Sequence, residues 1–218
     1  MCGGRRALSW FGVLAAVQMI VVSTVDGLTR PGYDELRNWV SQLALGPDGW
    51  RGTANLALCG LWLVLCGLGL SRRPVVWCGL LLVALAVVRT DAGLGFPPGV
   101  AEEHTTRGLI HQSIAVALAV VALVAVRNRL VAAVMAVSFT AATVLVLLDA
   151  WGVLPGTPSG LLERIALFTG FGWIGLVSGR AAWDSSGRRR RAERSTAGAD
   201  PGRTPGAASG TAGTESGR

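Results

Sequence analysis

Six apolar stretches follow one another along the chain, separated by short segments rich in polar residues, glycine, proline or arginine. Most of them approach the roughly 20 residues that a helix needs to cross a bilayer, and they carry almost no charge. The pattern predicts transmembrane helices over residues 7–25, 52–70, 75–88, 107–126, 130–148 and 161–182. We expect the third helix to continue through Asp91 to Gly95, before a loop that contains Pro97 and Pro98.

The first apolar stretch follows Arg5 and Arg6, an arrangement that signal peptides share. The stretch is about 19 residues long, which exceeds the apolar part of a signal peptide, and no cleavage site of small residues follows it. We therefore expect this segment to remain in the protein as its first transmembrane helix.

Arginines cluster in every second segment between the apolar stretches. With six spans, all the clusters fall on one side of the membrane, which the positive-inside rule identifies as the cytoplasm. The clusters are Arg5 and Arg6, Arg72 and Arg73, Arg127 and Arg129, and residues 188–191. Tryptophans near the predicted helix ends indicate an aromatic belt, with Trp10, Trp77 and Trp183 on the inner side and Trp39, Trp50 and Trp151 on the outer side. The sequence thus predicts a multi-pass plasma-membrane protein with both termini in the cytoplasm.

The composition supports a membrane protein over a soluble one. Charged residues make up 15% of the chain and the mean hydropathy is +0.49, whereas soluble domains carry about 25% charged residues. The net charge of +7 does not indicate a nucleic-acid partner, because the basic residues, all arginines, form no stripe interleaved with aromatics. The Ala, Gly, Val and Arg bias is typical of a high-GC bacterium. Cys59 and Cys66 share one helix face and are predicted to be buried.

Two domains are predicted. Residues 1–183 form an all-α, six-helix transmembrane bundle, and residues 184–218 form a cytoplasmic tail. The tail is rich in Arg, Ser, Gly, Ala and Thr and has no apolar periodicity, so we expect it to be disordered. The lipid bilayer is the predicted partner, while the oligomeric state is not indicated.

Ionisable side chains gather at the predicted outer helix ends. They are Asp26, Asp91, Glu102, Glu103, Asp149 and Glu163, together with both histidines, His104 and His111. His111 lies about one turn inside its helix, where an ionisable group needs a partner or a cavity. We predict a hydrogen-bonded pair with Asp91 across the short connecting loop, either as an acid–base pair or as a structural tie between helices.

A metal site is not expected, because His104 and His111 are seven residues apart, about 10 Å along a helix, and the carboxylates lack ligand spacing. Glu163 stands near a helix N-terminus, where an acid also complements the helix dipole. In the first outer loop, a short amphipathic helix is predicted with Leu36, Trp39, Val40 and Leu43 on one face, which would cap the bundle.

Three segments together resemble the domain of unknown function 998 family of bacterial membrane proteins, over residues 8–182. The segments are Trp-Val-Ser-Gln-Leu-Ala at 39–44, similar to an I-S-E-L-type motif; Arg-Thr-Asp at 89–91 with Gly-Leu-Ile-His at 108–111, similar to F-P-T-D…H-G-x-x-H; and Gly-Leu-Leu-Glu-Arg-Ile at 160–165 with Trp173, similar to G-x-x-E-R-x…W. Gln42 stands where an acid is common, Arg89 replaces a Phe-Pro start, and residues 93–103 form a longer segment. The resemblance implies a six-span fold and marks Ser41, Asp91, His111, Glu163 and Arg164.

Three functions stay open at this point. The first is an enzyme that acts on a lipid or isoprenoid-like substrate at the outer leaflet, with Asp91, His111 and Glu163 as catalytic residues and Ser41, His104 and Arg164 as binding residues. No cofactor is expected, since no phosphate-binding loop, dinucleotide fingerprint or zinc motif occurs. The alternatives are a carrier of a small hydrophobic molecule and a non-enzymatic accessory protein. An enzyme requires an open pocket at His111, and a carrier requires a cavity that reaches the middle of the membrane.

Overall fold

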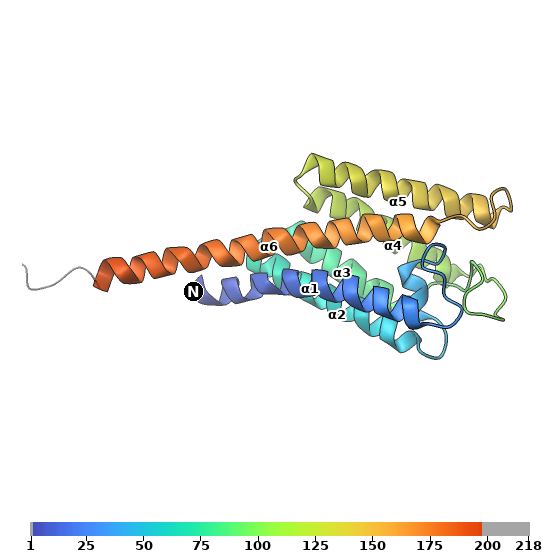
Figure 1. Ribbon diagram of the computed structural model, residues 1–218, viewed down its shortest axis with the longest axis horizontal. Helices are drawn as coiled ribbons and strands as arrows, with labels where there is room; N and C mark the ends of the chain where they lie inside the picture. The colour runs from blue at the N-terminus through green and yellow to red at the C-terminus, as the bar shows by residue number, and fades with distance from the viewer. Residues whose placement is uncertain (1, 198–218) are drawn as a thin grey trace, which may run out of the picture. The chain divides into compact units, whose positions relative to one another are not determined.

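The chain folds into α-helices joined by short loops, as the apolar stretches predict. The computed structural model describes residues 2–197, and within this part of the chain all regular elements are helical (Figure 1). In chain order they are α1 (Cys2–Thr29), the 3-10 helix η1 (Val40–Ala44), α2 (Gly49–Leu70), α3 (Arg73–Val87), α4 (Thr106–Ala125), α5 (Arg129–Ala150) and α6 (Ser159–Ala197). Five of the described helices, all except α3 and η1, contain segments long and apolar enough to cross a membrane.

Helix α3 is shorter than the sequence predicts. It ends at Val87, and Val88 has extended backbone angles (φ −91°, ψ 94°), so the predicted helical continuation to Gly95 is wrong. The apolar residues 92–96 instead form a loop in which Gly93 and Phe96 exchange backbone hydrogen bonds. With 15 residues, α3 spans about 22 Å, less than the roughly 30 Å of a hydrocarbon core.

The chain divides into two units, Met1–Trp183 and Asp184–Arg218. Residues 184–197, which the sequence assigns to a disordered tail, are the helical continuation of α6. Arginine and alanine are good helix formers, which is consistent with a helix that continues past the last apolar residue. The rest of the predicted tail, residues 198–218, lies outside the described residues.

Small residues allow the helices of the first unit to approach closely. A Cβ atom added to Gly60 of α2 would lie 2.7 Å from the carbonyl oxygen of Gly79 in α3. Helices α1 and α6 also approach closely, since a Cβ added to Gly175 of α6 would lie 2.9 Å from the side chain of Ala16 in α1. Cys59 and Cys66 are fully buried, as predicted. Close backbone approach therefore holds the bundle together, as in many membrane helices.

Residues 30–48, the cap segment, fold over one end of the bundle. Arg30 is buried, forms a 2.7 Å ion pair with Asp26 and donates to backbone carbonyls within the segment. Arg37 binds Asp149 at 3.1 Å and so ties the segment to the end of α5. The predicted amphipathic helix is the shorter η1, and Leu36 is exposed instead of lying on its buried face. Trp39 is buried and donates to Ser159, so its predicted place in an aromatic belt is wrong.

Candidate functional site

Arg164 of α6 is the main polar contact between the bundle and the cap segment. Its side chain is buried and donates hydrogen bonds to the carbonyl oxygens of Glu35 and Asn38, both at 2.8 Å. It also donates at 2.6 Å to the hydroxyl of Tyr33, over whose ring the guanidinium lies. A planar guanidinium with five donors suits this arrangement, in which several acceptors surround one cation. Arg164 thus fixes the position of the cap segment.

Tyr33 completes this contact. Its hydroxyl donates to the backbone carbonyls of Asn38 and Trp39, at 3.1 and 2.9 Å. Burial raises the pKa of Tyr33 above its usual value, and the neighbouring Arg164 only partly opposes this. The phenol is therefore neutral at physiological pH and acts as a hydrogen-bonding group.

Glu163, the residue beside Arg164, binds a different part of the cap segment. Its Oε2 accepts a 2.7 Å hydrogen bond from the backbone N–H of Val40, the first residue of η1. Among the described residues, none donates a hydrogen bond to its second oxygen, Oε1. The carboxyl group is consequently anchored at one oxygen and retains a second oxygen for other contacts.

His111 lies on the inner face of α4, 2% exposed, as predicted. Its Nδ1 forms a hydrogen bond with the backbone carbonyl of Val88, the residue that follows the end of α3. A carbonyl oxygen only accepts hydrogen bonds, so Nδ1 carries the proton in the neutral ring. The Nε2 atom is then the unprotonated nitrogen, and no described residue donates to it.

Asp91 binds Thr105 and not His111, its predicted partner. Its two oxygens accept hydrogen bonds of 2.6 Å from the backbone N–H and the hydroxyl of Thr105, the N-cap residue of α4. Partial desolvation raises the pKa of Asp91, but the Thr105 bonds, Arg107 and His104 outweigh it, so that the pKa is lowered overall. Asp91 therefore stabilises the start of α4, and His111 binds Val88 instead.

A cavity of about 420 Å³ lies between η1 and the helices α2 to α6. Its wall is mostly apolar and contains Leu56, Leu82, Ala119, Met135, Phe139 and Leu167 among other residues. The predicted site residues Ser41, His111 and Glu163 also line it, whereas Asp91, His104 and Arg164 are absent from its wall. Ligand pockets in proteins have this size and this combination of an apolar wall with few polar groups.

The cavity is open to the surface between α4 and α5. Val116 and Val120 of α4 and Val144 of α5 line it, yet they are 50%, 56% and 48% exposed. All three lie within segments apolar enough to cross a membrane. The opening therefore lies along the helix sides and not only at the capped end.

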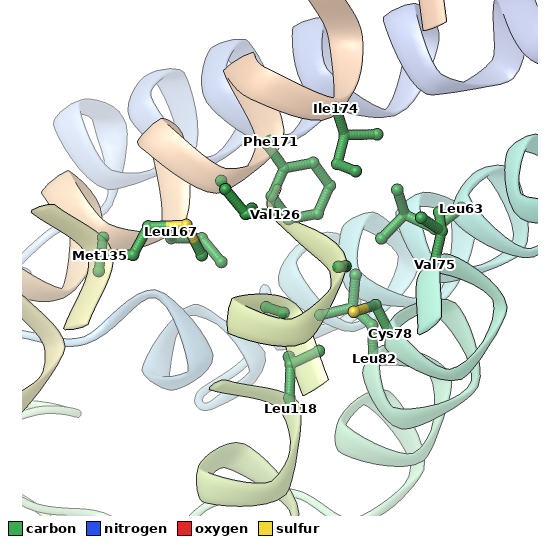
Figure 2. A pocket seen from close by; sticks show the side chains of 14 residues that line it. Leu63, Val75, Cys78, Leu82, Leu118, Val126, Met135, Leu167, Phe171 and Ile174 are labelled. Carbon is green, nitrogen blue, oxygen red and sulfur yellow. The ribbon is translucent and has the colours of Figure 1, made fainter. Parts of the chain in front are cut away.

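A second cavity, of about 70 Å³, continues the first toward the other end of the bundle. It is lined by side chains of α2 to α6 and by Val126, which follows α4; Leu63, Val75, Phe171 and Ile174 are among them (Figure 2). No charged residue lines it. Of these two cavities, only the larger one is lined by ionisable side chains, His111 and Glu163.

Several residues of the site are not evident from the sequence. Asn38 donates to the carbonyl of Leu94 and Gln42 donates to that of Gly93, so the cap segment is bound to the loop after α3. A glutamate at position 42 has no N–H to donate to Gly93. Two of the three departures from the family pattern, Gln42 and the long segment 93–103, are therefore in direct contact.

Comparison with known proteins identifies the family. The family model described as "Protein of unknown function (DUF998)" matches residues 13–180. This chain belongs to the DUF998 family. No curated protein and no solved structure matches it. The matched range of this DUF998 protein contains the cap segment, both cavities and every predicted site residue.

Proposed function

We propose that this DUF998 protein is a membrane enzyme that acts on a lipid-like substrate by acid–base chemistry. The observation that carries the proposal is that Glu163 and His111, on different helices, line the same apolar cavity. An imidazole and a carboxyl group are the side chains most used for proton transfer in enzymes. Ionisable groups within the apolar segments of a membrane protein are rare and often mark functional sites.

The hydrogen-bonding pattern supports a separate role for each group. With Nδ1 bound to the Val88 carbonyl, the free Nε2 of His111 acts as the base that accepts a proton from the substrate. Glu163, anchored through Oε2, presents Oε1 as the second proton donor or acceptor. Ser41, which also lines the cavity, contributes a hydroxyl that binds the polar head of the substrate.

The other predicted site residues then have supporting roles. Asp91 holds the start of α4 and so positions His111, five residues after the helix begins. Arg164 positions the cap segment, which carries Ser41 and the Val40 N–H. We assign no contact with substrate to His104, which is exposed and lies outside the cavity wall.

A carrier of a small hydrophobic molecule is the second candidate. It is favoured by the smaller cavity, which reaches Phe171 near the middle of the apolar segment Ser159–Asp184. A carrier moves its cargo without changing it, so the chemical identity of membrane lipids distinguishes the two functions.

The test compares lipid extracts from cells that produce the wild type, His111→Gln or Glu163→Gln, with Glu103→Gln as a control in an exposed acid outside the cavity. We expect the wild type and the control to convert one lipid species, and each cavity variant to lower that conversion by about 100-fold or more. Normal membrane levels and unfolding temperatures would show that the variants fold. Unchanged lipids with the wild type, or full conversion by both cavity variants, would refute the enzyme.

A further inference from the structure

We infer that the substrate is an amphiphile with a single hydrocarbon chain, which enters between α4 and α5 and extends from the larger cavity into the smaller one. The inference rests on the proposed function and adds the substrate class and its path. The inference requires that the two cavities are adjacent, that ionisable groups are confined to one end, and that the opening faces apolar surroundings.

The two cavities share much of their walls. Six residues line both, contributed by α3, α4, α5 and α6: Leu82, Leu118, Ala122, Met135, Ala166 and Leu167. Because the same side chains face both spaces, a single layer of side chains separates the larger cavity from the smaller one. Met135 and Leu167 have flexible side chains, and both are labelled at this junction in Figure 2.

The ionisable groups are confined to one end of the combined space. Glu163 and His111 lie on the wall of the larger cavity near the cap segment, and neither lines the smaller cavity. The smaller cavity is surrounded by aliphatic side chains, Cys78, Met135 and Phe171 (Figure 2). An amphiphile therefore fits in one orientation, with its polar head beside Glu163 and its chain toward Ile174.

The dimensions favour one chain over two. From Glu163 to Ile174, α6 rises by about 16 Å, which gives the chain a long and narrow path. The smaller cavity, at about 70 Å³, is one-sixth of the size of the larger one, at about 420 Å³. The smaller cavity has no space for a second chain beside the first.

The opening explains how such a molecule reaches the site. The exposed Val116, Val120 and Val144 line the larger cavity at the side of α4 and α5. In a bilayer these valines contact hydrocarbon, so an apolar chain passes between the helices without entering water. A water-soluble substrate would have to enter the hydrocarbon region to reach this opening.

The test is photo-crosslinking to the full chain in phosphatidylcholine nanodiscs. One hexadecanoic acid probe carries a diazirine near its carboxyl group and a second carries it near the chain end. We expect the first to label Phe139 or Thr143, which line only the larger cavity, and the second to label Phe171 or Ile174, which line only the smaller one. A two-chain phosphatidylcholine with a terminal diazirine should not label Phe171 or Ile174.

A matched pair of variants tests the path. Ala122→Trp places an indole at the junction and should abolish terminal labelling of Phe171, while head-end labelling of Phe139 persists. Ala117→Trp adds the same indole on the exposed side of α4 and should change neither. If Ala122→Trp fails to fold, Ala122→Leu gives the smaller obstruction, and terminal labelling should fall several-fold.

The outcomes separate the two proposals. Head-end labelling of Phe139 without terminal labelling of Phe171 overturns the chain path and leaves the proposed function in place. Labelling of neither residue overturns both. Terminal labelling that the junction variants do not reduce, or equal labelling by the two-chain lipid, overturns the inference of a single chain.

Discussion

The carboxylate of Glu163 accepts a 2.7 Å hydrogen bond from the backbone N–H of Val40, while the neighbouring Arg164 binds the carbonyl of Asn38 at 2.8 Å. Two consecutive residues of α6 therefore bind the same short part of the cap segment, one through an acceptor and one through a donor. The hydrogen bonds from the Arg164 guanidinium are charge-assisted, and such bonds are stronger than neutral ones. Its stability should depend on these two side chains more than on its apolar contacts.

Replacing Arg164 by alanine should destabilise the protein by about 3 kcal/mol, because buried carbonyl oxygens and the Tyr33 hydroxyl lose their donor. Thermal unfolding in detergent, followed by circular dichroism, measures the loss. Arg51→Ala is the control, since Arg51 is half exposed and its 3.6 Å ion pair with Asp48 lies on the surface. That variant should change stability by less than about 1 kcal/mol. Equal effects from the two variants would contradict the role given to Arg164.

Because α2 and α3 are in close contact, we expect one added methyl group between them to lower the stability of the protein. Gly60→Ala places a Cβ 2.7 Å from the Gly79 carbonyl, so the helices must separate, at a cost of about 1–3 kcal/mol. Gly172→Ala in α6 is the control, because no heavy atom lies within 4 Å of its added Cβ. It should be neutral or stabilise by up to about 1 kcal/mol. A neutral Gly60→Ala variant in the same unfolding assay would show that the helices are not in close contact.

Because the phenol of Tyr33 is buried, we expect the protein to lose stability at alkaline pH. Because burial raises its pKa in the folded protein, the unfolded chain releases the phenolic proton first, at a pH of about 10. The contribution of Tyr33 to stability should be constant below that pH and fall as pH rises above it. Tyr33 is the only tyrosine in the sequence, so tyrosinate absorbance in the near ultraviolet reports this residue alone.

The folded protein should form tyrosinate at higher pH than the urea-unfolded protein does. In Tyr33→Phe the stability should be lower at neutral pH, since the hydroxyl contacts are lost, and its decrease above pH 10 should be weaker. Identical titration curves for the folded and unfolded protein would refute the burial of the phenol.

The arginine clusters predict six crossings with both termini in the cytoplasm. Cysteine labelling of intact cells with a membrane-impermeant maleimide tests this, in a background from which the native cysteines have been replaced. A cysteine at Ser71 should stay unlabelled until the cells are opened, whereas a cysteine at the exposed Val100 should react from outside. Labelling of the Ser71 position in intact cells would reverse or reject the topology.

The apolar pattern predicts most of the helices because it reports directly which segments avoid water. It places the start of α4 at Arg107, one residue from the observed Thr106, and it indicates correctly that His111 is buried. The end of α3 is not predicted, because residues 92–96 are apolar in a loop as they would be in a helix. Ala92 and Phe96 of this loop are buried, and Phe96 packs against Tyr33 of the cap segment, which explains the apolar composition.

The partners of the site residues are harder to predict than their positions. Arg164 binds backbone carbonyls, and His111 binds the carbonyl of Val88. Backbone acceptors are present at every residue, so the sequence does not show which of them a side chain binds. A rule that pairs acids with bases therefore selects Asp91 for His111, although Asp91 is bound by Thr105.

The early end of α3 has a consequence for mutation. The carbonyl that fixes the proton on Nδ1 of His111 belongs to the backbone of Val88, so no side-chain replacement at position 88 removes it. A side-chain acceptor such as Asp91 disappears with a single codon change, whereas this one persists through most substitutions. Only an insertion, a deletion or a proline that shifts the end of α3 would displace it. Most substitutions at position 88 therefore leave the tautomer of His111, the proposed base, unchanged.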